Sequence, residues 1–104
     1  MTPQQMEKIL DASGIYRIEA AALFRVTRQT LANWLSGRPR KNEFIYEVAC
    51  GVTRMIFEAT KRKLLPLPPD TPYKDRAHMI KNRLDFVRKE LQNEAGKAGS
   101  VPRR

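Results

Sequence analysis

The chain has little of the chemistry that enzymes and metal proteins use. Its 104 residues include one cysteine, Cys50, and one histidine, His78. A zinc site needs three or four nitrogen, sulfur or oxygen ligands, and these two residues lie far apart in the sequence. A single cysteine also excludes a disulfide within the chain, which is typical of a reducing cytoplasm. We therefore predict a cytoplasmic protein that is not an enzyme and has no metal or cofactor.

Long apolar runs are missing as well. No stretch approaches the roughly 20 residues that a membrane-spanning helix requires, and the first residues lack the apolar segment of a signal peptide. We expect no membrane contact. The hydrophobic content of 41% predicts a small globular protein with a modest core.

Acidic residues are scarce, and none occurs from Ala20 to Asn42. The formal net charge is +9, and a strongly basic balance is typical of proteins that bind nucleic acid. Charge alone also fits a surface that is merely solvated, or a ribosomal protein. The acid-free window carries the basic residues Arg25, Arg28, Arg38, Arg40 and Lys41.

The same window predicts two short helices joined by a tight turn, over residues 17–24 and 28–36. Thr27 is a good N-cap for the second helix, because its hydroxyl can accept a backbone N–H two or three residues on. Gly37 ends that helix, because glycine adopts the left-handed conformation without a steric penalty. Leu31, Trp34 and Leu35 share one face of the helix, so we expect the opposite face to be exposed.

This stretch resembles the DNA-binding domain of the lambda-repressor and Cro family of phage and bacterial regulators. The similarity covers about residues 3 to 60. It rests on Ala21, Phe24, Val26, Thr27, Thr30, Leu31, Trp34 and Gly37, with Arg38 following the glycine. The family usually has glycine in the turn, where this chain has Arg25. A left-handed arginine there would be strained by roughly 1–2 kcal/mol.

The resemblance implies a helix-turn-helix that places its second helix in the major groove of double-stranded DNA. Arginine reads guanine and amides read adenine, so we expect base contacts from Arg28, Gln29 and Asn33. Phosphate contacts position the protein without reading sequence. We assign them to Arg25, Thr27, Thr30, Arg38, Arg40 and Lys41.

Two further helices are expected around this unit. Thr2 and Gln5 predict a capping box at the start of the first, with Pro3 at its first position. Asn42 predicts the start of a long helix over residues 43–64. Gly51 within it costs about 1 kcal/mol relative to alanine, which a close helix approach would explain. The expected apolar stripe of this helix is Phe44, Ile45, Val48, Ala49, Val52, Met55, Ile56 and Ala59.

Four prolines between residues 65 and 72 predict a stiff connector rather than a helix. A fifth helix should then run over residues 73–95, followed by a disordered basic tail at 96–104. The fifth helix has a heptad seam. This seam either folds back on its own chain or pairs with a second chain, and we favour pairing. Its residues are Tyr73, Ala77, Ile80, Leu84, Val87 and Leu91.

The sequence thus predicts an all-α, five-helix, lambda-repressor-like protein. Residues 1–65 form the DNA-binding domain, 66–72 the connector and 73–95 a dimerisation helix. We expect a homodimeric repressor that binds an inverted-repeat operator. Two alternatives remain: a phage small-terminase-like packaging protein, which forms rings, and an antitoxin that binds a protein partner and regulates its own operon.

Overall fold

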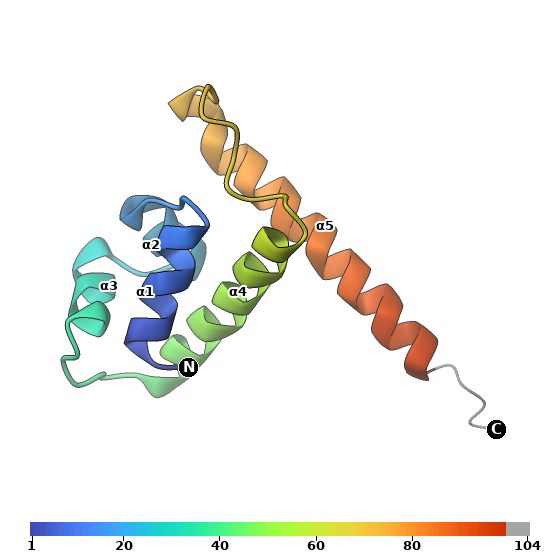
Figure 1. The fold of residues 1–104 in the computed structure, drawn as a ribbon. Coiled ribbons are helices and arrows are strands. Elements are labelled where there is room, and N and C mark those ends of the chain that lie inside the picture. The colour runs from blue at the N-terminus through green and yellow to red at the C-terminus, as the bar shows by residue number, and fades with distance from the viewer. Residues whose placement is uncertain (100–104) are drawn as a thin grey trace.

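The computed structural model describes the backbone of residues 1–99 and the side chains of residues 1–95. Over that range the chain is all-α and contains no strand, as the sequence predicts (Figure 1). Its helices, in chain order, are α1 (Pro3–Ala12), α2 (Arg17–Phe24), α3 (Arg28–Leu35), α4 (Glu43–Lys61) and α5 (Tyr73–Gly99).

Local side-chain chemistry fixes the beginnings of three helices. Thr2, Thr27 and Asn42 each accept a hydrogen bond from the backbone N–H three residues on, at 3.1, 3.0 and 3.2 Å. These bonds satisfy N–H groups that have no partner within the helix. The caps predicted for α1, α3 and α4 are therefore confirmed.

The ends of the last two helices differ from the predicted ones. α4 ends at Lys61 rather than Leu64, because Lys63 is left-handed, with φ 64°, and turns the chain away. α5 continues to Gly99, so residues 96–99, expected to be disordered, are helical. The rest of the expected tail, residues 100–104, lies outside the described residues.

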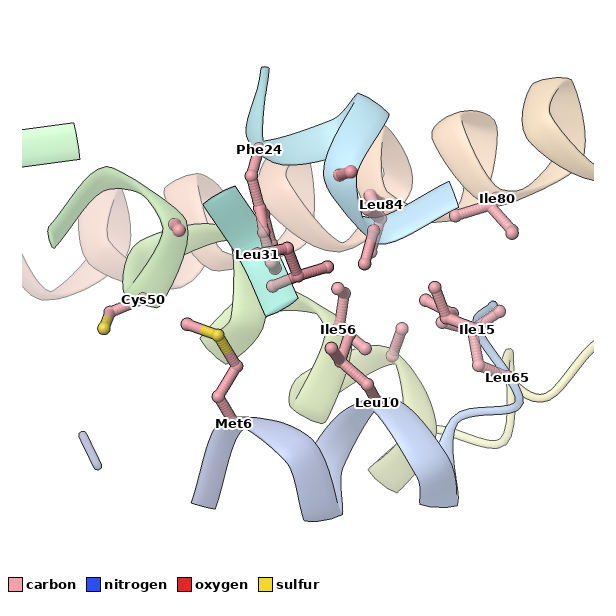
Figure 2. Close-up of a cluster of buried hydrophobic side chains, with 14 of the residues drawn as sticks. Met6, Leu10, Ile15, Phe24, Leu31, Cys50, Ile56, Leu65, Ile80 and Leu84 are labelled. Carbon is pink, nitrogen blue, oxygen red and sulfur yellow. The ribbon is translucent and has the colours of Figure 1, made fainter. Parts of the chain in front are cut away.

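All five helices contribute to one apolar core (Figure 2). α1 and α2 each pack on both α3 and α4, and α5 crosses α4 near the C-terminal end of α4 and projects beyond it (Figure 1). Two leucines of the connector, Leu65 and Leu67, are also buried. The connector is thus held against the core. The largest fully buried apolar side chains of this core are Met6, Leu10, Leu31, Ile56, Ile80 and Val87.

The buried face of α4 coincides only in part with the predicted one: Ala49, Ile56 and Ala59 are buried, as expected. Phe44, Ile45 and Val48 are 74%, 37% and 46% exposed. α1, α2 and α5 approach the helix from a different direction, and they bury a face that includes polar atoms. The Thr53 hydroxyl is satisfied there, since it donates to the Ala49 carbonyl at 2.7 Å. The residues that α4 buries are Tyr46, Ala49, Cys50, Thr53, Ile56 and Ala59.

The heptad seam of α5 packs on its own chain. Ile80, Leu84 and Val87 are buried in the shared core, and Leu91 packs against its margin. These side chains are therefore not available to pair with a second chain in this structure, contrary to the interpretation we favoured. Tyr73 and Ala77 are exposed. The buried residues of α5 and those of α1 to α4 belong to one cluster.

A buried ion pair ties the beginning of α5 to the beginning of α2. Arg76 Nε donates to Glu19 Oε2 at 2.8 Å, and Arg76 Nη2 donates to the Gly14 carbonyl at 2.6 Å. The guanidinium also lies 4.2 Å from the ring centroid of Tyr16. Burial alone would raise the pKa of Glu19, but hydrogen bonds from Arg76 and the Tyr16 N–H outweigh it and lower that pKa.

Candidate nucleic-acid interface

Arg25 is the residue at which the chain turns between α2 and α3. This residue is left-handed, with φ 59° and ψ 44°, where the family that the sequence resembles has glycine. The Val26 N–H donates to the Ala21 carbonyl at 3.0 Å and closes the end of α2. The backbone thus keeps the tight turn and accepts the strain of a side chain in this conformation.

Aromatic packing sets the orientation of α3. Trp34 is buried, with its ring centroid 6.5 Å from that of Phe24 and 5.2 Å from that of Tyr46. Leu31, one turn earlier, is buried beside it. These contacts hold one face of α3 against the core and turn the opposite face outward.

Gln29 and Asn33 lie together on that outward face. Gln29 Nε2 donates to Asn33 Oδ1 at 2.9 Å, across one turn of the helix. Within the described residues, no other side-chain hydrogen bond involves either amide. Both amides are thus held side by side while the Gln29 oxygen and the Asn33 nitrogen stay available for a ligand.

Arg28 lies at one edge of the exposed face, apart from the two amides. It lines a hollow of about 310 Å³ together with Glu7 and Arg17. Arg17 is itself held by Glu7 and Asp11, at 3.2 and 3.0 Å. The structure therefore brings two of the three expected base-reading residues together and places the third toward α1.

A second hollow, of about 410 Å³, borders the opposite edge of α3. It is formed by the α2–α3 turn, the outer side of α3 and the loop that leads into α4. Of the six residues expected to bind phosphate, all but Arg38 line it. The Thr27 hydroxyl donates to that of Thr30 at 2.9 Å. The lining members of that set are Arg25, Thr27, Thr30, Arg40 and Lys41.

Arg40 is less available than the sequence suggests. Its Nε donates to both carboxylate oxygens of Glu43, at 3.2 and 3.1 Å, and its guanidinium lies 3.9 Å from the Tyr46 ring centroid. Arg25, Arg28, Arg38 and Lys41 are exposed. None of these four forms an ion pair within the part of the chain that the structure describes.

The hollow is also lined by Val26, Trp34, Pro39, Asn42 and Ile45, none of which the sequence assigned to the site. Asn42 was recognised only as a helix cap, and Ile45 was assigned to the buried stripe of α4. Their position follows from the path of the loop between α3 and α4, for which the sequence contains no local signal.

Among residues 1–95, the cysteine and the acidic side chains do not gather into a second candidate site. Cys50 is a buried free thiol, and no group of three or more His, Cys, Asp or Glu side chains is placed to hold a metal ion in this range. Within the described helices, none combines the length and the apolar character that crossing a membrane requires.

Comparisons with family models, with curated proteins and with solved structures find no match to this chain. The similarity to the lambda-repressor and Cro family therefore stays a prediction from the residues themselves.

Proposed function

We propose that α2 and α3 form a helix-turn-helix and that the protein is a sequence-specific double-stranded DNA-binding repressor. In this proposal α3 enters the major groove, and α2 lies across the sugar–phosphate backbone. The repressor acts as a homodimer on an inverted-repeat operator.

The outward face of α3 carries the proposal. It presents Gln29 and Asn33 side by side on a helix whose other face is locked by Trp34. An amide side chain reads adenine in a bidentate arrangement: its NH₂ donates to N7 and its oxygen accepts from the N6 amino group. This geometry requires a helix that is held in a fixed orientation. Paired amides on the exposed face of a helix packed in this way are suited to reading adenine in the major groove.

The surroundings of α3 fit a polyanion. Exposed cations flank it on both sides, with Arg28 near α1, and Arg25 and Lys41 around the opposite hollow. No acidic residue occurs in the segment that contains the turn, α3 and the following loop. Such cations would release counterions from DNA and make binding strongly dependent on salt.

Two copies are needed for an operator of useful length. One recognition helix contacts about four or five base pairs, and a two-fold dimer doubles that number. The two α3 helices would occupy successive major grooves about 34 Å apart.

Selection from a random duplex library at moderate salt would identify the preferred site. We expect an inverted repeat with adenine at specific half-site positions, and affinity that falls steeply with salt. Recovery of no preferred duplex would contradict the proposal. A ring-sized assembly would favour a packaging protein, and stoichiometric co-purification with another protein would favour an antitoxin.

The Gln29→Ala variant tests the orientation of α3. We expect it to lose about 1–3 kcal/mol of binding to the selected site and to tolerate other bases at one or two positions. Gln92→Ala, the same change at an exposed position of α5, is the control. Unchanged affinity and specificity of Gln29→Ala would show that α3 does not read bases through this face.

A further inference from the structure

The outward side of α4 carries an apolar stripe that the rest of the described chain leaves largely uncovered. Its members follow one another at intervals of four, three and four residues, which places them on one line along the helix. Phe44 is 74% and Val48 46% exposed, and Gly51 and Met55 are partly exposed. The stripe is Phe44, Val48, Gly51 and Met55.

Gly51 lies at the middle of this stripe and has no explanation within its own chain. A side-chain Cβ built at this glycine meets nothing within 4 Å. Glycine in a helix interior is less favourable than alanine. Alanine at position 51 would therefore make the isolated chain more stable. Close approach of another backbone is the situation in which glycine is required at such a position.

We propose that this stripe is the surface on which a second copy of the chain packs, with the two α4 helices antiparallel. This inference rests on the proposed function, because it supplies the dimer that an inverted repeat requires. A two-fold axis between Ala49 and Cys50 makes the stripe self-complementary. Val48 of one copy then meets Gly51 of the other, and Phe44 meets Met55.

The charges beside the stripe agree with this register. Glu47 and Arg54 are exposed, line the same hollow on one side of the helix and form no ion pair within the described residues. The two-fold axis sets Glu47 of one copy opposite Val52 of the other. Arg54 of that copy is then only about 3 Å further along the helix axis. The pairing of opposite charges favours a second copy over an unrelated apolar partner.

The same arrangement separates the two DNA-reading helices. α3 lies beside the N-terminal end of α4, where Trp34 packs on Tyr46. In an antiparallel pair these ends are on opposite sides of the dimer. The two Asn42 residues are separated by about 22 Å along the helix direction, given a rise of about 1.5 Å per residue. This offset contributes to the separation of about 34 Å that successive major grooves require of the two α3 helices.

Sedimentation equilibrium of the full chain tests the surface, with Val48→Lys as the first variant. We expect its dimer dissociation constant to rise about tenfold or more, because a charge replaces a contact at the interface centre. Phe57→Lys is the matched control, since Phe57 is also 46% exposed but lies on a different side of α4. It should dimerise like the unmodified protein.

The Gly51→Ala variant tests whether Gly51 lies in an interface between two chains or has a role only within its own chain. Since the added methyl group meets nothing in its own chain, the melting temperature measured under monomeric conditions should rise. The dimer should weaken, because the methyl group would meet Val48 of the other copy. A rise in stability with unchanged dimerisation would overturn the proposal.

Charge reversal tests the register. Glu47→Arg and Arg54→Glu should each weaken the dimer, and the double variant should recover most of the loss. An unmodified chain that is monomeric or forms a ring, or a double variant weaker than both singles, would overturn the antiparallel pair. A dimer with these properties but no duplex binding would refute the proposed function alone. Duplex binding by a monomer would refute this inference and the homodimer, and would leave α3 as the proposed DNA-reading helix.

Discussion

Two sets of arginines in this chain have opposite surroundings. Arg76 is 8% exposed and is engaged by a carboxylate, a backbone carbonyl and an aromatic ring. Arg25, Arg28 and Arg38 are exposed and have no carboxylate partner among the described residues. The same side chain thus has a structural role at the junction of α2 and α5. Around α3 it is left available for an anion from outside the chain.

Arg76 therefore stabilises the fold, whereas Arg25, Arg28 and Arg38 can bind a ligand. A buried cation must have its partners within the protein, because removing it from water is costly. An exposed cation contributes little to stability through nearby carboxylates. We therefore expect changes to the first group to affect unfolding and changes to the second group to affect binding.

Of the changes proposed in this section, Arg76→Ala should have the largest effect on the free energy of unfolding. The change leaves the Glu19 carboxylate buried without its cation, so we expect a loss of about 3–5 kcal/mol in the free energy of unfolding. Urea unfolding followed by circular dichroism measures it. Arg88→Ala is the control, because its ion pair with Asp85 is exposed and should contribute less than about 1 kcal/mol. Equal losses in the two variants would contradict the distinction.

Acid should weaken the same junction. The folded chain lowers the pKa of Glu19, so the stabilisation is complete above the unfolded value of about 4.3 and is lost as the pH falls through the lower folded value. Unfolding measured from pH 6 to pH 2 should show this decline. Glu19→Gln should flatten it over the acidic part of the range. The same slope in both proteins would mean that other carboxylates cause the acid sensitivity.

Arg25→Gly should have the smallest effect on stability, in the opposite direction. Glycine relieves the left-handed strain, so we expect a gain of about 1 kcal/mol in the free energy of unfolding. Loss of one phosphate contact should reduce the salt dependence of duplex binding by about one unit of slope. Ala22→Gly, within α2, should instead lose about 1 kcal/mol. A loss of stability in Arg25→Gly would show that the Arg25 side chain supports the turn.

Features that depend on neighbouring residues could be predicted from the sequence. Thr2, Thr27 and Asn42 cap their helices through bonds that span three residues, and Gly37 ends α3 with φ 83°. The pairing of Gln29 with Asn33 likewise follows from helix geometry. The pattern of α3 therefore indicated which side would face outward before its packing was known.

Features that depend on where a helix meets another could not be predicted. The face that α4 buries is set by the directions from which α1, α2 and α5 approach, so the apolar Phe44 is exposed while Thr53 is buried. The ion pair between Glu19 and Arg76 joins residues that are 57 positions apart. Heptad spacing in α5 predicted an apolar seam. It could not indicate whether that seam packs on the same chain or on a second chain.

The junction of α2 and α5 also has a consequence for biosynthesis. As the chain leaves the ribosome from its N-terminus, Glu19 and Ile15 emerge long before Arg76 and Ile80, with which they share the buried junction and core. Since domains fold as units during synthesis, we expect the segment proposed to recognise DNA to remain incompletely packed until α5 has emerged. A nascent chain stalled before α5 would then be a substrate for chaperones and proteases rather than a partial repressor.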